Sequence, residues 1–293
     1  MKKFVVISVL ISIITCANAQ VKDLPWVETN IVEESLPVPY VHIRQADAIW
    51  AKVLWRIIDL REKMNHPLYY PTTPQGNLMS LGQVIFNAVL NDSLPVYQDY
   101  YCRIPSMVKV TDTVRQAKSE LTDDGEIVET GEITETVIPL TSDKIFKYKI
   151  REVWFFDKQR SSLHPQIIAI CPVIDKTEFN ANMYASMGEI PEDVLEDIKS
   201  RDRNAELGWI YYDDLRPYLA KYYSYNTRNQ SEGTSYDDIL TWQRNFHSYV
   251  YIESNVYDNR EINSYIKNPW DQILESEKTI DAIRVFEHDL WEF

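Results

Sequence analysis

The segment between residues 145 and 173 constrains the fold most, because it has the pattern of two strands joined by a turn. From Ile145 to Phe156 large apolar residues alternate with polar ones, and this period of two places one set of side chains on a single face of a strand. That set is Phe146, Tyr148, Ile150, Trp154 and Phe156. Turn residues follow at 161–165, and Gln166–Val173 returns as an apolar run. The segment therefore predicts an antiparallel β-hairpin.

A second strong pattern lies at Ala46–Met64, where apolar residues recur at intervals of three and four. The set is Ile49, Trp50, Val53, Leu54, Ile57, Ile58, Leu60 and Met64. This spacing predicts an amphipathic helix with a wide buried face. Charged residues such as Lys52 and Arg56 fall on the opposite side, and Trp55 falls with them. We therefore expect Trp55 to be exposed.

Other elements are expected along the chain from the same signals. Ser80 has the position of an N-cap before a short helix that runs to Val89. Further helices are expected from Pro191, at 236–245 and at 271–291, the last with Ile273, Ile280, Ile283 and Leu290 on one stripe. Strands are expected at 97–105 and 247–257. Helices and strands are segregated rather than regularly alternating, which predicts the α+β class with mixed helices and antiparallel hairpins.

The domain organisation is expected to be simple. Residues 20–45 contain several prolines and predict an extended N-terminal arm. Residues 46–293 are expected to form a single globular domain. Within it, residues 114–143 are dense in Glu, Asp and Thr, which fits either an exposed hairpin or a flexible acidic insertion.

The first 19 residues have the pattern of a secretory signal peptide. Lys2 and Lys3 precede a short uncharged apolar run, and a small-residue cleavage site places the cut between Ala19 and Gln20. An N-terminal membrane anchor is the first alternative, although the run is shorter than the about 20 residues that span a bilayer. Lipidation at Cys16 is the second alternative. No later stretch is apolar enough to cross a membrane, so we expect a soluble exported protein.

The formal net charge limits the classes of molecule that the chain is expected to bind. Loss of the two signal lysines would change the net charge from −14 to −16. An acidic chain repels phosphate backbones and anionic lipid, so nucleic acid is not an expected partner. Cys102 and Cys171 are the cysteines that remain after cleavage. An oxidising compartment permits a bond between them, but we expect Cys171 to be a free thiol in a buried strand.

Motifs for catalysis or cofactor binding are missing from the sequence. The seven glycines do not form a dinucleotide loop, a P-loop or a nucleophile elbow. The five histidines do not have the close spacing of a zinc helix. Adjacent acids at 213–214 and 237–238 point apart on a regular chain and do not make a catalytic pair. We therefore expect no catalytic residue, cofactor or metal, although a set assembled from distant residues stays open.

Aromatic residues provide the positive signal for binding. Tyr occurs 19 times and gathers between 211 and 225. Tyr and Trp are the residue types most used at interface hot spots, although many of these side chains will fill the core. The candidate interface residues are Trp55, Tyr211, Tyr212, Tyr222, Tyr223 and Tyr225.

Four segments together resemble one known family. They are Ala46–Asn65 with its Trp-Arg-x-x-Asp-Leu-Arg-Glu-Lys-Met string, Val153–Arg160 with the His164–Pro165 turn, Trp209–Pro217, and Phe286–Glu292. They resemble the GldN/PorN family, and the resemblance extends over nearly the whole mature chain. The long Trp-Arg string is specific.

The resemblance implies a periplasmic, non-enzymatic component of the type IX secretion system of Bacteroidota, linked in many members to gliding motility. It further implies that the chain forms a ring with an outer-membrane lipoprotein of the GldK/PorK type, at the inner face of the outer membrane. It also implies contact with the periplasmic part of an inner-membrane motor of the GldM/PorM type. From the residues alone, an exported enzyme or a small-ligand-binding protein stays open as the alternative.

Overall fold

The structure is a computed structural model. It describes residues 35–74, 78–91, 94–106, 111–121, 127–139, 142–175, 204–226 and 233–290. The signal peptide, the first part of the expected arm and the helix expected from Pro191 lie outside these residues.

The fold belongs to the α+β class, as the segregated pattern predicts. The strands are β1 (Ala48–Asp59), β2 (Val96–Tyr97), β3 (Pro105–Ser106), β4 (Thr111–Leu121), β5 (Ile127–Pro139), β6 (Ile145–Asp157), β7 (Ser162–Asp175), β8 (Asn204–Glu206), β9 (Ile210–Tyr211), β10 (Tyr223–Ser224), β11 (Thr234–Ser235) and β12 (Tyr249–Glu253). The helices are η1 (Lys63–Asn65), α3 (His66–Tyr69), α4 (Leu81–Asn91), η2 (Ser142–Lys144), α7 (Tyr212–Leu219), the π-helix η3 (Asp238–Gln243), α8 (Ile262–Tyr265) and α9 (Pro269–Asp289).

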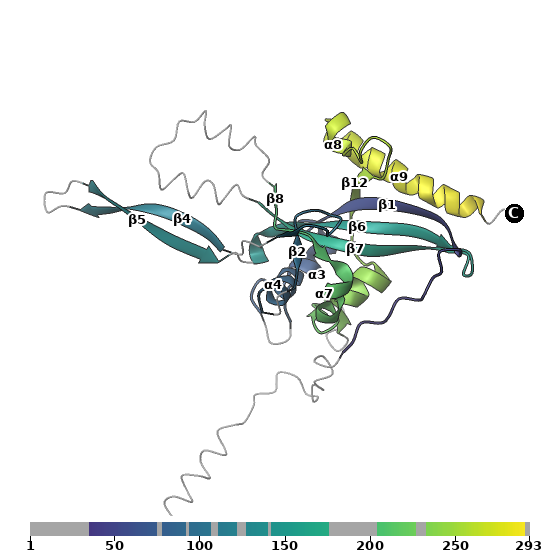
Figure 1. The fold of residues 1–293 in the computed structure, drawn as a ribbon, viewed down its shortest axis with the longest axis horizontal. Coiled ribbons are helices and arrows are strands. Elements are labelled where there is room, and N and C mark those ends of the chain that lie inside the picture. Colours follow the sequence, from purple (N-terminus) through teal and green to yellow (C-terminus); the bar gives the residue numbers. More distant parts are fainter. Residues whose placement is uncertain are drawn as a thin grey trace, which may run out of the picture. The chain divides into compact units, whose positions relative to one another are not determined.

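The predicted hairpin is confirmed and forms the centre of the main sheet. Strands β6 and β7 pair antiparallel, from Ile145 opposite Ile174 to Asp157 opposite Ser162. The strand order is β12-β1-β6-β7-β8, and β9 also pairs with β7 (Figure 1). The acidic segment contains a hairpin as well, because β4 pairs antiparallel with β5.

The helix predicted over residues 46–64 is wrong. Residues 48–59 form β1, which pairs with β6 on one side and with β12 on the other. Sequence periodicity failed here because this strand is buried on both faces. Leu54 and Ile58 point to one face, whereas Trp55 points to the other, and all three are nearly inaccessible to solvent. The apolar residues from the two faces of this strand together have the same spacing as the apolar residues on one face of a helix.

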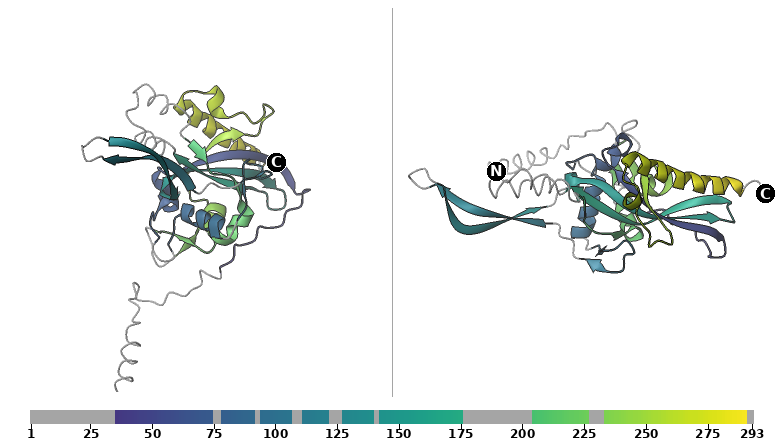
Figure 2. Two further views of the ribbon diagram at one scale, coloured as in Figure 1. Left: turned by 60° about the vertical axis from the view of Figure 1, so that its left-hand side comes forward. Right: turned by 90° about the horizontal axis from the view of Figure 1, so that it is seen from above.

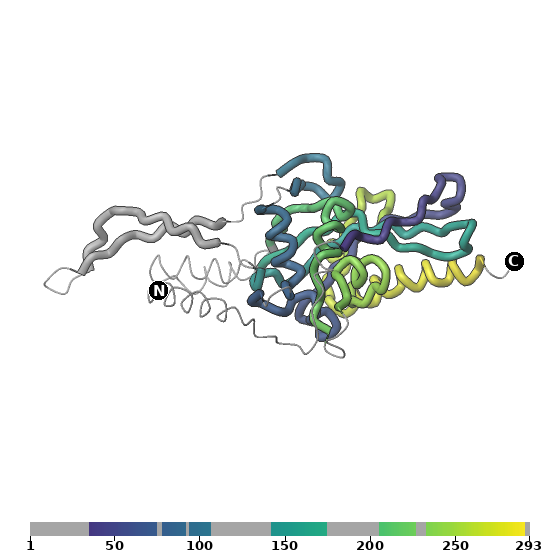
Figure 3. Tube along the Cα trace, turned by 90° about the horizontal axis from the view of Figure 1, so that it is seen from below, coloured from purple at the N-terminus to yellow at the C-terminus, as the bar shows by residue number. Residues whose placement is uncertain are grey.

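One face of the main sheet is covered by two groups of helices. The first group is α4, α7 and η3, whose apolar side chains pack with Ile58, Tyr148 and Ile170 in the largest core. The second is α9, which packs through Ile283 on Leu54 and Val250. α9 runs lengthwise along the sheet toward the end where β6 turns into β7 (Figures 2 and 3).

A buried group of charges separates these two cores. The Glu152 carboxylate is fully buried on the same face of β6. It accepts a hydrogen bond from Arg244 Nη2 at 2.7 Å, one from Arg56 Nη1 at 3.3 Å and one from the Trp154 indole at 2.9 Å. Since Arg56 belongs to β1 and Arg244 follows η3, this carboxylate ties the helices to the sheet.

The opposite face carries a smaller core. Trp55, Ala169, Cys171, Trp209 and Ile252 form it, and the segment that contains Tyr97, Tyr100 and Cys102 covers it. The expectation of a buried strand position for Cys171 is confirmed, and both cysteines are free thiols in the structure.

Several local predictions are confirmed. Ser80 precedes α4 in a capping box, since its Oγ accepts from the Gln83 N–H and the Gln83 side chain accepts from the Ser80 N–H. A helix lies within 236–245, a strand within 247–257, and a long helix at the C-terminal end. The predicted stripe on that helix is only partly right, because Ile283 is buried whereas Ile273 and Leu290 are exposed.

The chain from Ser35 to Tyr40 is neither helix nor strand, and it lies across α7 and η3. Arg216 of α7 donates to the Val38 carbonyl and stacks on the Tyr40 ring at 4.1 Å. Asp237 holds the same guanidinium in a buried bidentate ion pair at 2.8 and 2.9 Å.

Candidate partner-binding surface

The structure removes Trp55 from the candidate interface. Its side chain is 1% exposed and packs edge-on against Tyr100, with ring centroids 5.2 Å apart. The expectation of exposure is wrong because the residue lies on a strand, where it alternates to the second face of the sheet, and not on the polar side of a helix.

The tyrosines between 211 and 225 do not form one surface. Tyr212 is fully buried in the largest core, where its hydroxyl is 3.0 Å from that of Thr241, so it is also removed as an interface residue. Tyr211 is half-buried at the edge of the sheet. Its pKa is raised mainly by burial and, to a smaller extent, by the negative charge of the nearby Asp213. Tyr222 and Tyr223 are partly buried.

Tyr225, in contrast, is 41% exposed. It is therefore the member of this set that the structure leaves most accessible. The sequence cluster separates because β9, α7 and β10 follow one another there, and each element turns its aromatic side chains in a different direction.

Several strongly exposed large apolar side chains lie near the start of α9 and in the segment before it. The set is Val256, Tyr257, Tyr265, Trp270, Ile273 and Leu274, which we call the C-terminal apolar surface. Val256 is 90% exposed, Trp270 77% and Tyr257 75%. A concentration of such residues is typical of protein interfaces, because water contact with them is unfavourable in the free subunit.

The local structure explains why these residues remain outside the core. Asn268 caps α9 by accepting from the Trp270 N–H at 3.2 Å. The helix then contacts the sheet only later, where Ser276 Oγ accepts from the Val250 N–H at 2.7 Å and Ile283 enters the core. The first turns of α9 therefore present their apolar side chains to solvent.

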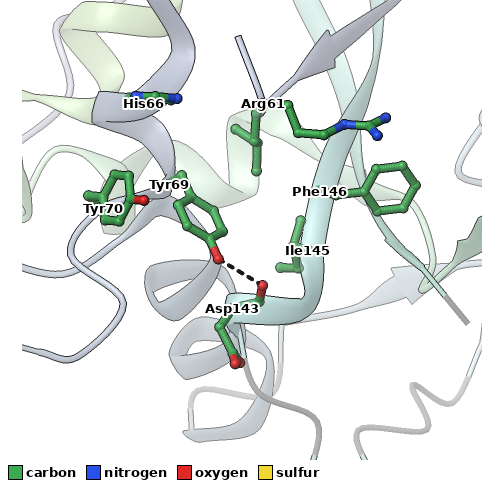
Figure 4. Close-up of a pocket in the computed structure, with 8 residues that line it drawn as sticks. Arg61, His66, Tyr69, Tyr70, Asp143, Ile145 and Phe146 are labelled. Atoms are coloured by element: carbon green, nitrogen blue, oxygen red, sulfur yellow. Dashed lines mark hydrogen bonds between the residues drawn. The ribbon is translucent and has the colours of Figure 1, made fainter. Parts of the chain in front are cut away.

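A pocket of about 240 Å³ lies between the turn after β1, α3, η2 and the start of β6 (Figure 4). The Tyr69 hydroxyl closes one side by donating to the Asp143 carbonyl at 3.1 Å. The Arg61 guanidinium stacks on Phe146 at 5.5 Å on another side. Its volume lies below the roughly 300–1,000 Å³ of typical small-molecule sites.

The thiols of the described residues have environments that disfavour the reactive thiolate. Burial raises the pKa of Cys102 to about 11 and raises that of Cys171 still further. In the part of the chain that the structure describes, no group of three or more His, Cys, Asp or Glu residues is placed to hold a metal ion. Within the same residues, none of the helices combines the length and apolar character needed to cross a membrane.

Comparison with known families gives a match over nearly the whole chain. The model of a family described as "Gliding motility associated protein GldN" matches residues 43–292, nearly the whole chain. No curated protein matches the sequence.

Proposed function

Because the chain belongs to the GldN family of gliding motility associated proteins, we propose that it is a non-enzymatic structural subunit of the type IX secretion and gliding machinery. The subunit works in the periplasm as part of a ring. It is held at the inner face of the outer membrane by a lipoprotein of the GldK/PorK type and contacts an inner-membrane motor of the GldM/PorM type.

The observation that carries this proposal is the C-terminal apolar surface. Trp270 and Leu274 lie one turn apart on α9 and are 77% and 53% exposed. Trp is among the residue types that supply most of the binding energy when a partner buries them, and neighbouring apolar side chains exclude water around it. A subunit that works by attachment needs such a surface, whereas an isolated enzyme does not.

The proposed location has separate support in the sequence. The first 19 residues have the signal-peptide pattern, with cleavage between Ala19 and Gln20. The acidic mature chain gains nothing from an anionic lipid surface, so a protein partner is the physically consistent means of attachment. Charge then sets the choice and orientation of the partner, while apolar contact supplies affinity.

The test is the double substitution Trp270→Ala with Leu274→Glu in the full-length protein, in cells that carry the whole machinery. The expected result is a normal far-UV circular dichroism spectrum of the purified protein together with loss of outer-membrane co-fractionation and of secretion. Val285→Glu is the matched control, because Val285 is 58% exposed on the same helix but lies away from its first turns.

Two results would count against the proposal. If the double variant folds, still co-fractionates and still supports secretion, the C-terminal apolar surface is not the attachment site. If the unmodified protein stays in the soluble periplasmic fraction while the lipoprotein is present, the attachment itself is wrong.

A further inference from the structure

The arginines divide into two groups by their partners. Most of those whose side chains the structure describes form ion pairs with Asp or Glu. Arg103, Arg151 and Arg260 have no carboxylate within ion-pair distance among the described residues. In a chain with a formal net charge of −14, cations without an acidic partner are unexpected.

Two of these arginines, Arg103 and Arg151, lie against one tyrosine, Tyr101, whereas the guanidinium of Arg260 lies 5.2 Å from the centre of the Tyr265 ring. The guanidinium of Arg103 lies 4.9 Å from the centre of the Tyr101 ring and that of Arg151 lies 5.0 Å from it. Asn259, next to Arg260 in the chain, donates to the Tyr101 hydroxyl at 3.4 Å. We call Tyr101, Arg103, Arg151 and Asn259 the arginine–tyrosine surface.

The sheet sets the position of Arg151. It lies opposite Trp55 on β1 and opposite Ala169 on β7, so the three share the second face. Its guanidinium stacks 5.8 Å from the Trp55 ring, and its Nη1 donates to the Tyr100 carbonyl at 3.5 Å. Its buried Nε has no hydrogen-bond partner. The side chain is thus held by aromatic rings, while its charge is not neutralised.

Arginines ordered on aromatic rings are suited to bind carboxylates. The planar guanidinium offers paired donors to a carboxylate, and stacking lowers the entropy lost on binding. Tyr and Arg are also the residue types enriched at interface hot spots. The arginine–tyrosine surface therefore fits an acidic protein segment.

The chain itself contains a segment with this chemistry. Residues 111–139, which include β4 and β5, have eight acidic residues against the two bases Arg115 and Lys118. In the described part of the chain, β4 and β5 pair only with each other. A two-stranded hairpin is marginally stable in water unless its strands pack on another surface.

We propose that the arginine–tyrosine surface of one subunit binds the acidic β4–β5 hairpin of a second copy. The two surfaces are different, so the contact is head-to-tail and can repeat from subunit to subunit. This proposal rests on the proposed ring function, because it names the contact between neighbouring subunits.

The test measures self-association of the purified mature protein by sedimentation velocity over a range of protein and salt concentrations. Arg103→Glu should weaken association by about tenfold or more, and added salt should weaken association of the unmodified protein, as expected for a charged contact. Arg151 is left unchanged because it also packs on Trp55. Arg44→Glu is the matched control, since it reverses one exposed charge elsewhere.

A charge-exchange experiment tests whether the segment bound at the arginine–tyrosine surface is the β4–β5 hairpin. Glu129→Lys, Glu132→Lys and Glu135→Lys on β5 should also weaken association, and mixing this variant with the Arg103→Glu variant should restore it. If the arginine variant associates as the unmodified protein does, or if the mixed variants fail to associate, the proposal is wrong. Weakened self-association of the Arg103→Glu variant, together with unchanged outer-membrane co-fractionation, would separate this contact from the lipoprotein attachment.

Discussion

Replacing Glu152 by Ala tests the role of the buried charge group between the two cores. The substitution removes a fully buried carboxylate and leaves the guanidinium groups of Arg56 and Arg244 without a counter-ion. Breaking a buried ion pair in this way costs about 3–5 kcal/mol of unfolding free energy. The Arg56 and Arg244 side chains are still 14% and 19% exposed, so water relieves part of this cost and the lower end of the range is expected.

Glu152→Gln separates charge from shape. The amide keeps the size of the side chain and one oxygen that accepts a hydrogen bond, but it has no charge to balance the two arginines. Loss of a hydrogen bond to a charged group costs about 1.5–3 kcal/mol, so this variant should lie between Glu152→Ala and the unmodified protein.

The measurement is unfolding by urea, followed by tryptophan fluorescence and far-UV circular dichroism. Urea is preferred because guanidinium chloride would itself screen the charges. Asp281→Ala is the control, because Asp281 is a carboxylate in an exposed ion pair with Arg284, and its loss should change stability by at most about 0.5 kcal/mol. If Glu152→Ala loses no more than this control, the buried group does not connect the two cores.

Four further outcomes follow. Burial tends to raise the pKa of Glu152, but Arg244 and Arg56 outweigh it and hold the pKa below its usual value. The stabilisation from Glu152 is therefore fully present above the unfolded-state pKa of about 4.3 and is lost as pH falls through the folded-state pKa. Glu152→Ala should remove this contribution, so that the unfolding free energy measured in urea depends less on pH. Gly208→Ala should destabilise the fold by about 1–3 kcal/mol or more in the same assay, because the backbone φ is +138° and a Cβ would lie 2.3 Å from Val96 Cγ1. Ile283→Ala should cost about 2–5 kcal/mol and loosen α9, which hydrogen exchange of that helix would report. In the native protein a thiol reagent should modify Cys102 well before the fully buried Cys171, and equal rates would show that the second face of the sheet is open.

Local signals in the sequence predicted the parts of the fold that depend on neighbouring residues. The β6–β7 hairpin follows from strict alternation and turn residues, and the start of α4 follows from Ser80 and Gln83. The α+β class follows from the order of these elements. The family resemblance was also available from the sequence, because long strings such as that at 55–64 are specific without any knowledge of their conformation.

Only the tertiary structure determined which strands pair, which side chains are buried and which distant residues are in contact. A strand that is buried on both faces has no alternation to detect, and so β1 had the spacing of a helix. Its neighbours β6 and β12 determine that Trp55 is buried. In the same way, the grouping of Arg103 and Arg151 at Tyr101 joins segments about 50 residues apart, and no local pattern reports such a contact. Burial and pairing of charges are properties of the packed chain, because they depend on which distant residues share a face.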